Sequence, residues 1–188
     1  MSKCITQDYR CRGCPVKEAC NIERVMIDSS ILLSIIKHED AQLISEEKLN
    51  QIKKDGQGFI THIILAEVYE KTINFIEEEL SRLDEEFNIS DYATPWKLKS
   101  VLEIIEVLKC TLERLKVVEV DKESWGYIQK LFSLPRMDMK NRDIINLGAA
   151  ESYLHKKFLF IDRGIKSAEK SIKDAGFKIE LEHLRLVK

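Results

Sequence analysis

The chain contains few residues that interrupt regular structure, and it has no long apolar run. Its 188 residues include three prolines and seven glycines, which argues against a disordered or fibrous protein. No apolar run approaches the roughly 20 residues of a membrane-spanning helix. The N-terminus carries charges and cysteines where a signal peptide needs an uninterrupted apolar stretch. We therefore expect a soluble cytoplasmic protein with one domain of ordinary size, a small appendage and no membrane partner.

The chain also lacks a strong excess of charge of either sign. Its net charge of −2 gives no overall signature of nucleic-acid binding. The charge is unevenly distributed, because residues 67–91 hold nine acidic residues, whereas residues 140–188 hold eleven Lys or Arg against seven acidic residues. Lys166 and Lys170 in the basic part are candidates for contacts with phosphates. Solvated helix faces account for these lysines equally well.

The apolar pattern predicts strands that alternate with helices. Strands are expected at 25–28, 59–61, 117–120, 158–162 and 177–181, and helical spacing occupies most of the sequence between them. Such an alternation is typical of a parallel sheet with helices on both faces. We predict a three-layer α/β/α domain over 25–188, with a central parallel sheet of four to five strands. Two long helices within about 76–116, separated by a break at 88–95, are expected to form an inserted antiparallel hairpin for packing, substrate gating or dimerisation.

Four acidic residues lie within or at the end of apolar runs: Asp28, Glu67, Asp143 and Asp162. Asp28 and Asp162 end predicted strands, and the carboxyl ends of parallel strands face the crevice where α/β proteins bind ligands. Clustered carboxylates repel one another, so the arrangement is best explained by a divalent cation between them. The pattern indicates a metal-dependent phosphodiesterase, although an Asp after a strand is also an ordinary helix cap.

The segments around these acids resemble the PIN-domain nucleases. The resemblance covers VMIDSSILL at 25–33, FITHIILAEV at 59–68, DIINLGAAE at 143–151 and FLFIDRGIKSA at 158–168. The stretch between Glu67 and Asp143 is longer than a minimal domain of that family needs. The resemblance implies that the four acids hold one or two Mg²⁺ or Mn²⁺ ions. It also implies that RNA is the substrate, and that Ser29 or Ser30 hydrogen bonds to a carboxylate or a phosphate.

Other ligands, partners and functions stay open at this point. Asp138 and Glu151 are reserve ligands for the metal, and Glu169 is a weaker one. The resemblance leaves room for a homodimer and for an antitoxin-type protein partner, which one chain cannot reveal. An inactive PIN-like module that binds nucleic acid or protein is one alternative. A metal-dependent phosphatase with Asp28 as nucleophile is another, although Ser30 stands where such an enzyme needs a second Asp.

Four of the five cysteines lie close together near the N-terminus: Cys4, Cys11, Cys14 and Cys20. Their spacing, C-x6-C-x2-C-x5-C, lets four thiolates face one zinc ion or one iron–sulfur cluster, and the choice between these stays open. Disulfides are the alternative, but they are uncommon in an intracellular protein. We predict a metal-binding segment at 1–24, separate from the domain that follows. The fifth cysteine, Cys110, lies in a helical pattern and is expected to be an inert core residue.

Overall fold

The computed structural model describes residues 23–87, 93–134, 138–153 and 156–184. Five strands form one sheet in the order β3-β2-β1-β4-β5, and every pair of neighbours is parallel. The strands are β1 (Val25–Ile27), β2 (Gly58–Thr61), β3 (Lys116–Val118), β4 (Lys157–Phe160) and β5 (Glu180–His183). The prediction of a parallel α/β fold is therefore confirmed.

The central strands are apolar because both faces of the sheet are covered. Val25, Met26 and Ile27 of β1 are buried, and so are the aromatic residues Phe158 and Phe160 of β4. A strand that is covered on both faces has no polar side to show in its sequence, which is why these strands are continuous apolar runs. They form the centre of the core.

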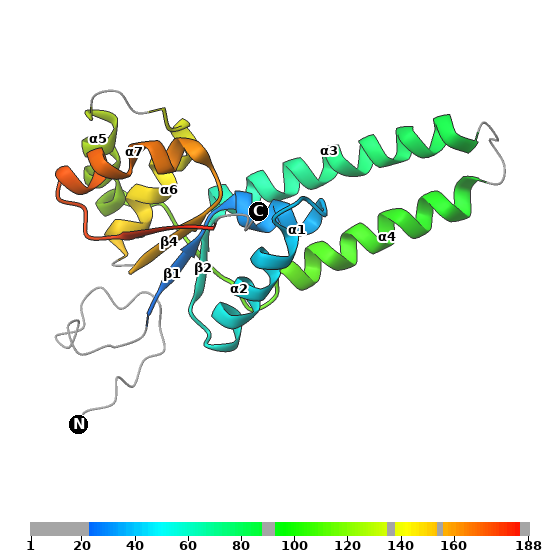
Figure 1. Ribbon diagram of the computed structural model, residues 1–188, viewed down its shortest axis with the longest axis horizontal. Coiled ribbons are helices and arrows are strands. Elements are labelled where there is room, and N and C mark those ends of the chain that lie inside the picture. Colours follow the sequence, from blue (N-terminus) through cyan, green and yellow to red (C-terminus); the bar gives the residue numbers. More distant parts are fainter. Residues whose placement is uncertain (1–22, 88–92, 135–137, 154–155, 185–188) are drawn as a thin grey trace.

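Helices cover the two faces of the sheet in separate groups (Figure 1). One face carries α1 (Ser29–Ile36) and α2 (Gln42–Lys54), together with the first part of α3 (His62–Phe87) and the last part of α4 (Ala93–Leu112). The other face carries α5 (Lys122–Phe132), α6 (Asn141–Ser152) and α7 (Arg163–Asp174). Among the described residues, no helix has both the length and the apolar character needed to cross a membrane.

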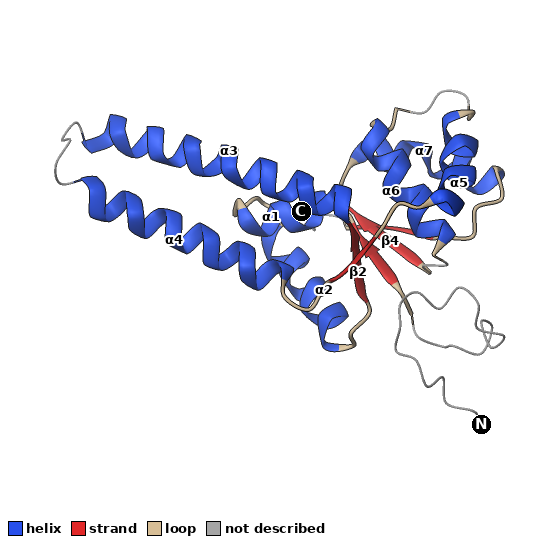
Figure 2. Cartoon of the chain, turned by 180° about the vertical axis from the view of Figure 1, so that it is seen from behind, coloured by secondary structure: helices blue, strands red, loops and turns tan. Residues whose placement is uncertain are grey.

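The two longest helices lie side by side and run antiparallel, and their outer parts project from the body of the molecule (Figure 2). This pair is the predicted hairpin. The predicted break at 88–95 is too long at its C-terminal side, because α4 already begins at Ala93 and contains Pro95. Proline is tolerated in the first turn of a helix, where a backbone N–H has no intrahelical acceptor to lose.

The last strand begins later than the predicted range of 177–181. β5 starts at Glu180, which pairs with Lys157 of β4. The backbone N–H groups of Lys178 and Ile179 instead donate to the buried carboxylate of Glu151, at 3.0 to 3.2 Å and 3.0 Å. Because the N–H groups of Lys178 and Ile179 are bonded to Glu151 of α6, they are not paired with β4, and the strand begins only at Glu180.

Candidate active site

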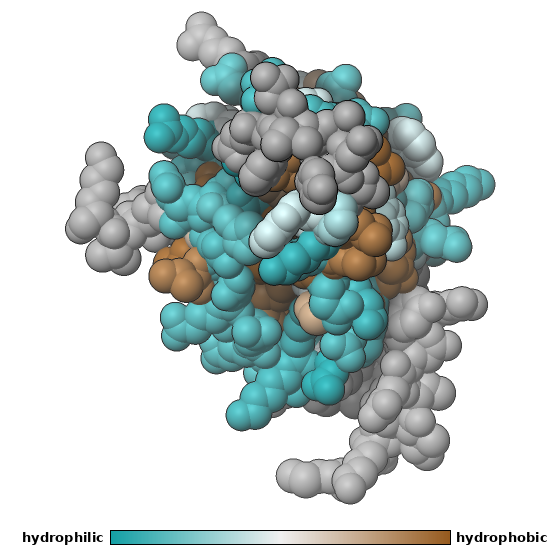
Figure 3. Space-filling model, turned by 90° about the vertical axis from the view of Figure 1, so that its right-hand side faces the viewer, coloured by the Kyte–Doolittle hydropathy of each residue, from teal (hydrophilic) through white to brown (hydrophobic). Residues whose placement is uncertain are grey.

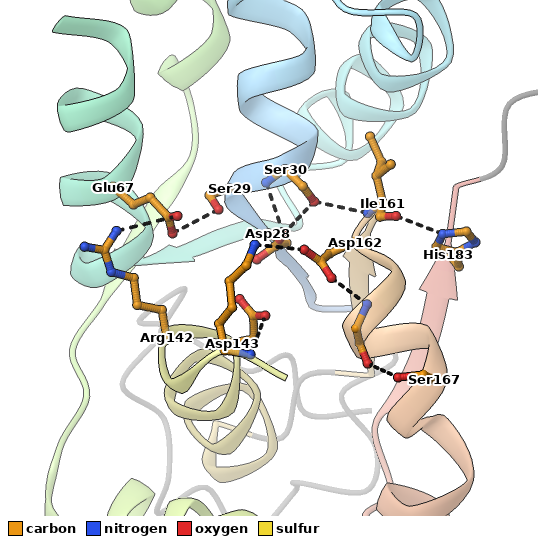
Figure 4. A network of polar contacts seen from close by, with 12 residues as sticks. Asp28, Ser29, Ser30, Glu67, Arg142, Asp143, Ile161, Asp162, Ser167 and His183 are labelled. Carbon is orange, nitrogen blue, oxygen red and sulfur yellow. Dashed lines mark hydrogen bonds and ion pairs between the residues drawn. The ribbon is translucent and has the colours of Figure 1, made fainter. Parts of the chain in front are cut away.

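The strand order reverses between β1 and β4, and an aspartate follows each of these neighbouring strands. Asp28 comes directly after β1, and Asp162 comes two residues after β4. The connections from β1 and from β4 leave toward opposite faces of the sheet, and the carboxyl ends of two such strands are where open parallel sheets bind ligands. Glu67 of α3 and Asp143 of α6 face the same place (Figure 4). We call these four residues the acidic edge.

Asp28 is almost completely buried, with 2% of its surface exposed. One carboxylate oxygen, Oδ2, accepts hydrogen bonds from the backbone N–H and the hydroxyl of Ser30, at 3.0 and 2.5 Å. The other oxygen, Oδ1, is buried and has no partner in the described part of the chain. Burial raises the pKa of Asp28, and the nearby charge of Glu67 raises it further, although the hydrogen bonds from Ser30 oppose both effects. A cation beside this oxygen would compensate for its burial.

Ser30 connects Asp28 to the segment that follows β4. Its hydroxyl donates to Asp28 and accepts a hydrogen bond from the backbone N–H of Ile161, at 3.1 Å. The carbonyl of Ile161 is 2.9 Å from Nε2 of His183 at the end of β5, so this ring nitrogen is the donor (Figure 4). These bonds link the ends of three adjacent strands and fix the position of the Asp28 carboxylate.

Asp143 lies in the first turn of α6 and is buried, with 6% exposed. Burial raises its pKa to about 7, with further contributions from the charges of Asp28 and Asp162. Asn146 lies one turn later in α6 and fixes the position of the helix against the sheet. Its side-chain oxygen accepts a 2.7 Å hydrogen bond from the hydroxyl of Thr61 at the end of β2. A buried carboxyl beside two others is costly to ionise, and a divalent cation would remove that cost.

Asp162 caps the N-terminus of α7. Its Oδ1 accepts a 2.6 Å hydrogen bond from the N–H of Gly164, and its Oδ2 lies 3.1 Å from the ammonium of Lys140. Partial burial raises the pKa of Asp162, but these bonds outweigh burial and the net shift is downward. A Cβ on Gly164 would lie 2.9 Å from the Asp138 carbonyl oxygen and 3.0 Å from Asp162 Oδ1, so glycine is required here. The helix-cap interpretation is therefore correct for Asp162 and equally for Asp28, which caps α1 through the N–H of Ser30.

Glu67 approaches the acidic edge from α3. Its Oε2 accepts a 3.1 Å hydrogen bond from the hydroxyl of Ser29, and its Oε1 lies 3.6 Å from the guanidinium of Arg142. Arg142 also reaches Glu70, at 3.3 Å. The expected hydrogen bonds from Ser29 and Ser30 to carboxylates are thus present, and each serine serves a different acid.

Two cations beside the acidic edge were missed from the sequence. Lys140 precedes α6 and Arg142 lies in its first turn, so both flank Asp143. The hydrogen bond to Asp162 raises the pKa of Lys140, and the charges of Asp143 and Glu67 add to this effect. The sequence did contain a sign of their role, because both basic residues lie within three positions of Asp143, a candidate catalytic acid. Such residues can neutralise the acids or bind a phosphate.

The fit of this site to a divalent cation depends on the chemistry of its donors. Among the described residues, no three His, Cys, Asp or Glu side chains are close enough together to hold one ion. The acids nevertheless face one region, one buried oxygen lacks a partner among the described residues, and burial together with the charges of Asp28 and Asp162 raises the pKa of Asp143. Carboxylate oxygens are the ligands that Mg²⁺ and Mn²⁺ prefer. The donor set therefore suits these ions by its chemistry, and the side chains of Glu67 and Asp162 would have to exchange Arg142 and Lys140 for the ion.

The other candidate ligands have different environments. Glu151, at the opposite end of α6, binds the backbone before β5 and is structural. Glu169 pairs with Lys166 and Lys173, and these hydrogen bonds lower its pKa to about 2. Asp138 is exposed.

The predicted phosphate contacts lie on α7. Lys166 pairs with Glu169, and Lys170 is exposed on the next turn of the same helix. Contact with a phosphate stays a prediction for both.

Of the five cysteines, only Cys110 falls within the described residues. It is exposed, and its thiol donates to Glu106, so the prediction of a core residue is wrong. The helical pattern identified its element correctly, but Cys110 lies at an open groove that it lines together with Leu49 and Lys53 of α2, and not in the core. Cys4, Cys11, Cys14 and Cys20 lie outside the described residues, so zinc or iron–sulfur binding and the domain boundary near residue 24 stay predictions.

The sequence matches no protein-family model and no curated protein. In structure the chain is similar to VapBC2 from Rickettsia felis, which was crystallised bound to a DNA fragment from its promoter. The match has a TM-score of 0.50 and 17% sequence identity, and it covers 85% of this chain and 97% of the other. At this identity the likeness shows the fold alone, a parallel α/β sheet covered by helices, and leaves the activity to be argued from the site.

Proposed function

We propose that this chain is a metal-dependent nuclease whose active site is the acidic edge. The observation that carries the proposal is the buried carboxylate of Asp28, one oxygen of which has no partner among the described residues, beside three further acids. Lys140 and Arg142 contact Asp162 and Glu67, but in the described part of the chain Asp28 and Asp143 are buried beside these acids without a cation of their own, and both burial and repulsion oppose folding. A cation that binds phosphate explains why they are there. The PIN-like fold supports the proposal.

The residues divide into ligands, positioning groups and cations. Asp28, Glu67, Asp143 and Asp162 would hold Mg²⁺ or Mn²⁺, which when bound supplies an activated water for attack on a phosphodiester and charge for the leaving oxygen. Ser30 holds the Asp28 carboxylate in place, and Ser29 does the same for Glu67. The hydrogen bond between Thr61 and Asn146 sets the depth of Asp143.

Lys140 and Arg142 are proposed to exchange partners during the reaction cycle. Both now contact acids of the site, at 3.1 Å to Asp162 and 3.6 Å to Glu67. Both side chains are substantially exposed, at 72% and 48%, so they can turn toward solvent without being desolvated. An arriving phosphodiester offers them an alternative anion. Lys166 and Lys170 are proposed as further phosphate contacts along α7, and the choice of RNA follows from the PIN resemblance.

The decisive experiment measures cleavage of a labelled single-stranded RNA with Mn²⁺ and with EDTA. We expect cleavage only with the metal, and a loss of at least about a hundredfold in Asp28→Asn and in Asp162→Asn, because each removes a charged ligand. Binding of Mn²⁺, measured by calorimetry, should weaken in both variants. Asp55→Asn is the control, since Asp55 is exposed and precedes β2 at the opposite edge of the sheet.

Two other outcomes would replace the proposal. Hydrolysis of a small phosphate ester without cleavage of RNA would indicate a phosphatase. Binding of RNA without any cleavage would indicate an inactive module. Cleavage that resists EDTA, or wild-type activity in either variant, would show that the acidic edge is not the active site.

A further inference from the structure

Helix α4 presents an apolar face to solvent on the hairpin. Leu98, Leu102 and Ile105 are 58%, 55% and 45% exposed, and we call them the apolar stripe. Their spacing of four and three residues places them on one side of the helix, whereas Ile104 and Thr111 on another side are buried. Figure 3, which looks along the hairpin from its outer end, shows hydrophobic side chains at the surface among hydrophilic ones. Soluble proteins seldom leave a row of large apolar side chains uncovered.

The stripe has the spacing of a coiled-coil seam. Positions separated by alternating steps of four and three residues are the core positions of a heptad, at which a second helix packs. The stripe lines a shallow groove together with Pro95 and the flanking charges of Lys99, Glu103 and Glu106. Lys99 directly follows Leu98, and Glu106 directly follows Ile105, so these two charges occupy equivalent heptad positions on the same flank.

We infer that α4 docks against α4 of a second copy of this chain, with the two helices antiparallel. In an antiparallel pair, equivalent flanking positions of the two helices face each other. Lys99 then meets the partner's Glu106, and the two-fold axis repeats the pair on the other side. Each Leu102 packs against the partner's Ile105. With α3 behind each α4, the two hairpins form a four-helix arrangement.

The opposite orientation fits less well. In a parallel pair, each flanking charge would face the other flank of the partner helix, which in this chain carries Val101 and Leu108. Lys99 and Glu106 would then gain no opposite charge. Within one chain Lys99 pairs with Glu103 at 3.8 Å and Glu106 with Lys109 at 3.4 Å, and the side chains of Lys99 and Glu106 are each 63% exposed. They are therefore accessible to a partner.

The first test measures the mass of the full chain by sedimentation equilibrium across the micromolar range. A reversible dimer is expected, because three apolar side chains from each copy form a small interface. Leu102→Glu should weaken association by about tenfold or more, since it places like charges at the centre of the interface. Leu43→Glu on α2 is the matched control, because Leu43 is even more exposed, at 79%, and lies outside the stripe.

The second test decides the orientation. Lys99→Glu alone and Glu106→Lys alone should each associate more weakly, because like charges then face each other. An equimolar mixture of the two variants should regain association, since each Glu of one chain would face a Lys of the other. A monomeric parent, association that resists Leu102→Glu, or a mixture no stronger than its components would overturn the inference.

Discussion

The acidic edge and the hairpin place their side chains in opposite ways. At the acidic edge, carboxylates are buried where apolar residues would be more stable, and Asp28 is 2% exposed. On α4, apolar residues are exposed where polar ones would be more soluble, and Leu102 is 55% exposed. Each region therefore contradicts the simple rule that apolar residues are inside and charged residues outside.

The two contradictions point to different kinds of ligand. A buried charge with an unpartnered oxygen calls for a small cation, because only an ion fits beside it and compensates it. An exposed apolar row calls for a large partner, because only another helix covers its length. The departures from the rule thus indicate what each region binds, whereas the well-packed core between them contributes stability alone.

The largest effect on stability is expected from Asp143→Asn in metal-free protein. The neutral form of Asp143 is favoured by folding, because burial and the neighbouring acids raise its pKa from 3.8 to about 7. Its stabilising contribution is complete below pH 3.8 and is lost as the pH rises through about 7. Above that pH we expect Asp143→Asn to be more stable than the parent by roughly 2 to 4 kcal/mol.

Urea unfolding in EDTA at several pH values measures this difference, with Asp55→Asn as the control. The gap between variant and parent should close as the solution is made acidic. A difference in unfolding free energy that does not depend on pH would mean that the surroundings of Asp143 do not favour its neutral form. The acidic edge would then not be a place where buried charge opposes folding, and its contrast with the exposed apolar stripe would fail.

Ser30→Ala should have a smaller effect in the opposite direction. The change removes the bond to Asp28 and leaves the N–H of Ile161 without its acceptor. A loss of about 1 to 3 kcal/mol is expected, because a buried polar group loses its partner. Ser133→Ala is the control, since Ser133 is exposed and bonds only within its own turn. Equal unfolding free energies for the two variants would show that Ser30 does not hold the site together.

The smallest effect is expected on the hairpin. Ile105→Gln should change the unfolding free energy of the monomer by no more than about 0.5 kcal/mol, because Ile105 already faces water. The adjacent Ile104 is buried, and Ile104→Ala should cost about 2 to 4 kcal/mol. Thermal unfolding at low protein concentration measures both variants. A large loss in Ile105→Gln would mean that the stripe packs within the chain and is not free for a partner.

Much of the fold could be predicted because local pattern determines it. The apolar strands β1, β2 and β4 and the helices that follow them lie within a few residues of their expected positions. The four acids were identified because each lies next to an apolar run, and the sheet brings them to one edge. The start of β5 was misplaced because its position depends on Glu151, which lies 28 residues before Ile179.

Lys140, Arg142 and Cys110 show what depends on three dimensions. The nearness of Lys140 and Arg142 to Asp143 is visible in the sequence, but which carboxylate each of them contacts, and whether Cys110 is exposed, follow only after α4 and α6 have docked. The sequence by itself determined most of the strands and helices and the four acids that lie within or beside their apolar runs, because these depend on periodicities of two and 3.6 residues. Only the tertiary structure decided which face of α4 is exposed and how close the four acids come, because both depend on the packing of elements distant in the chain.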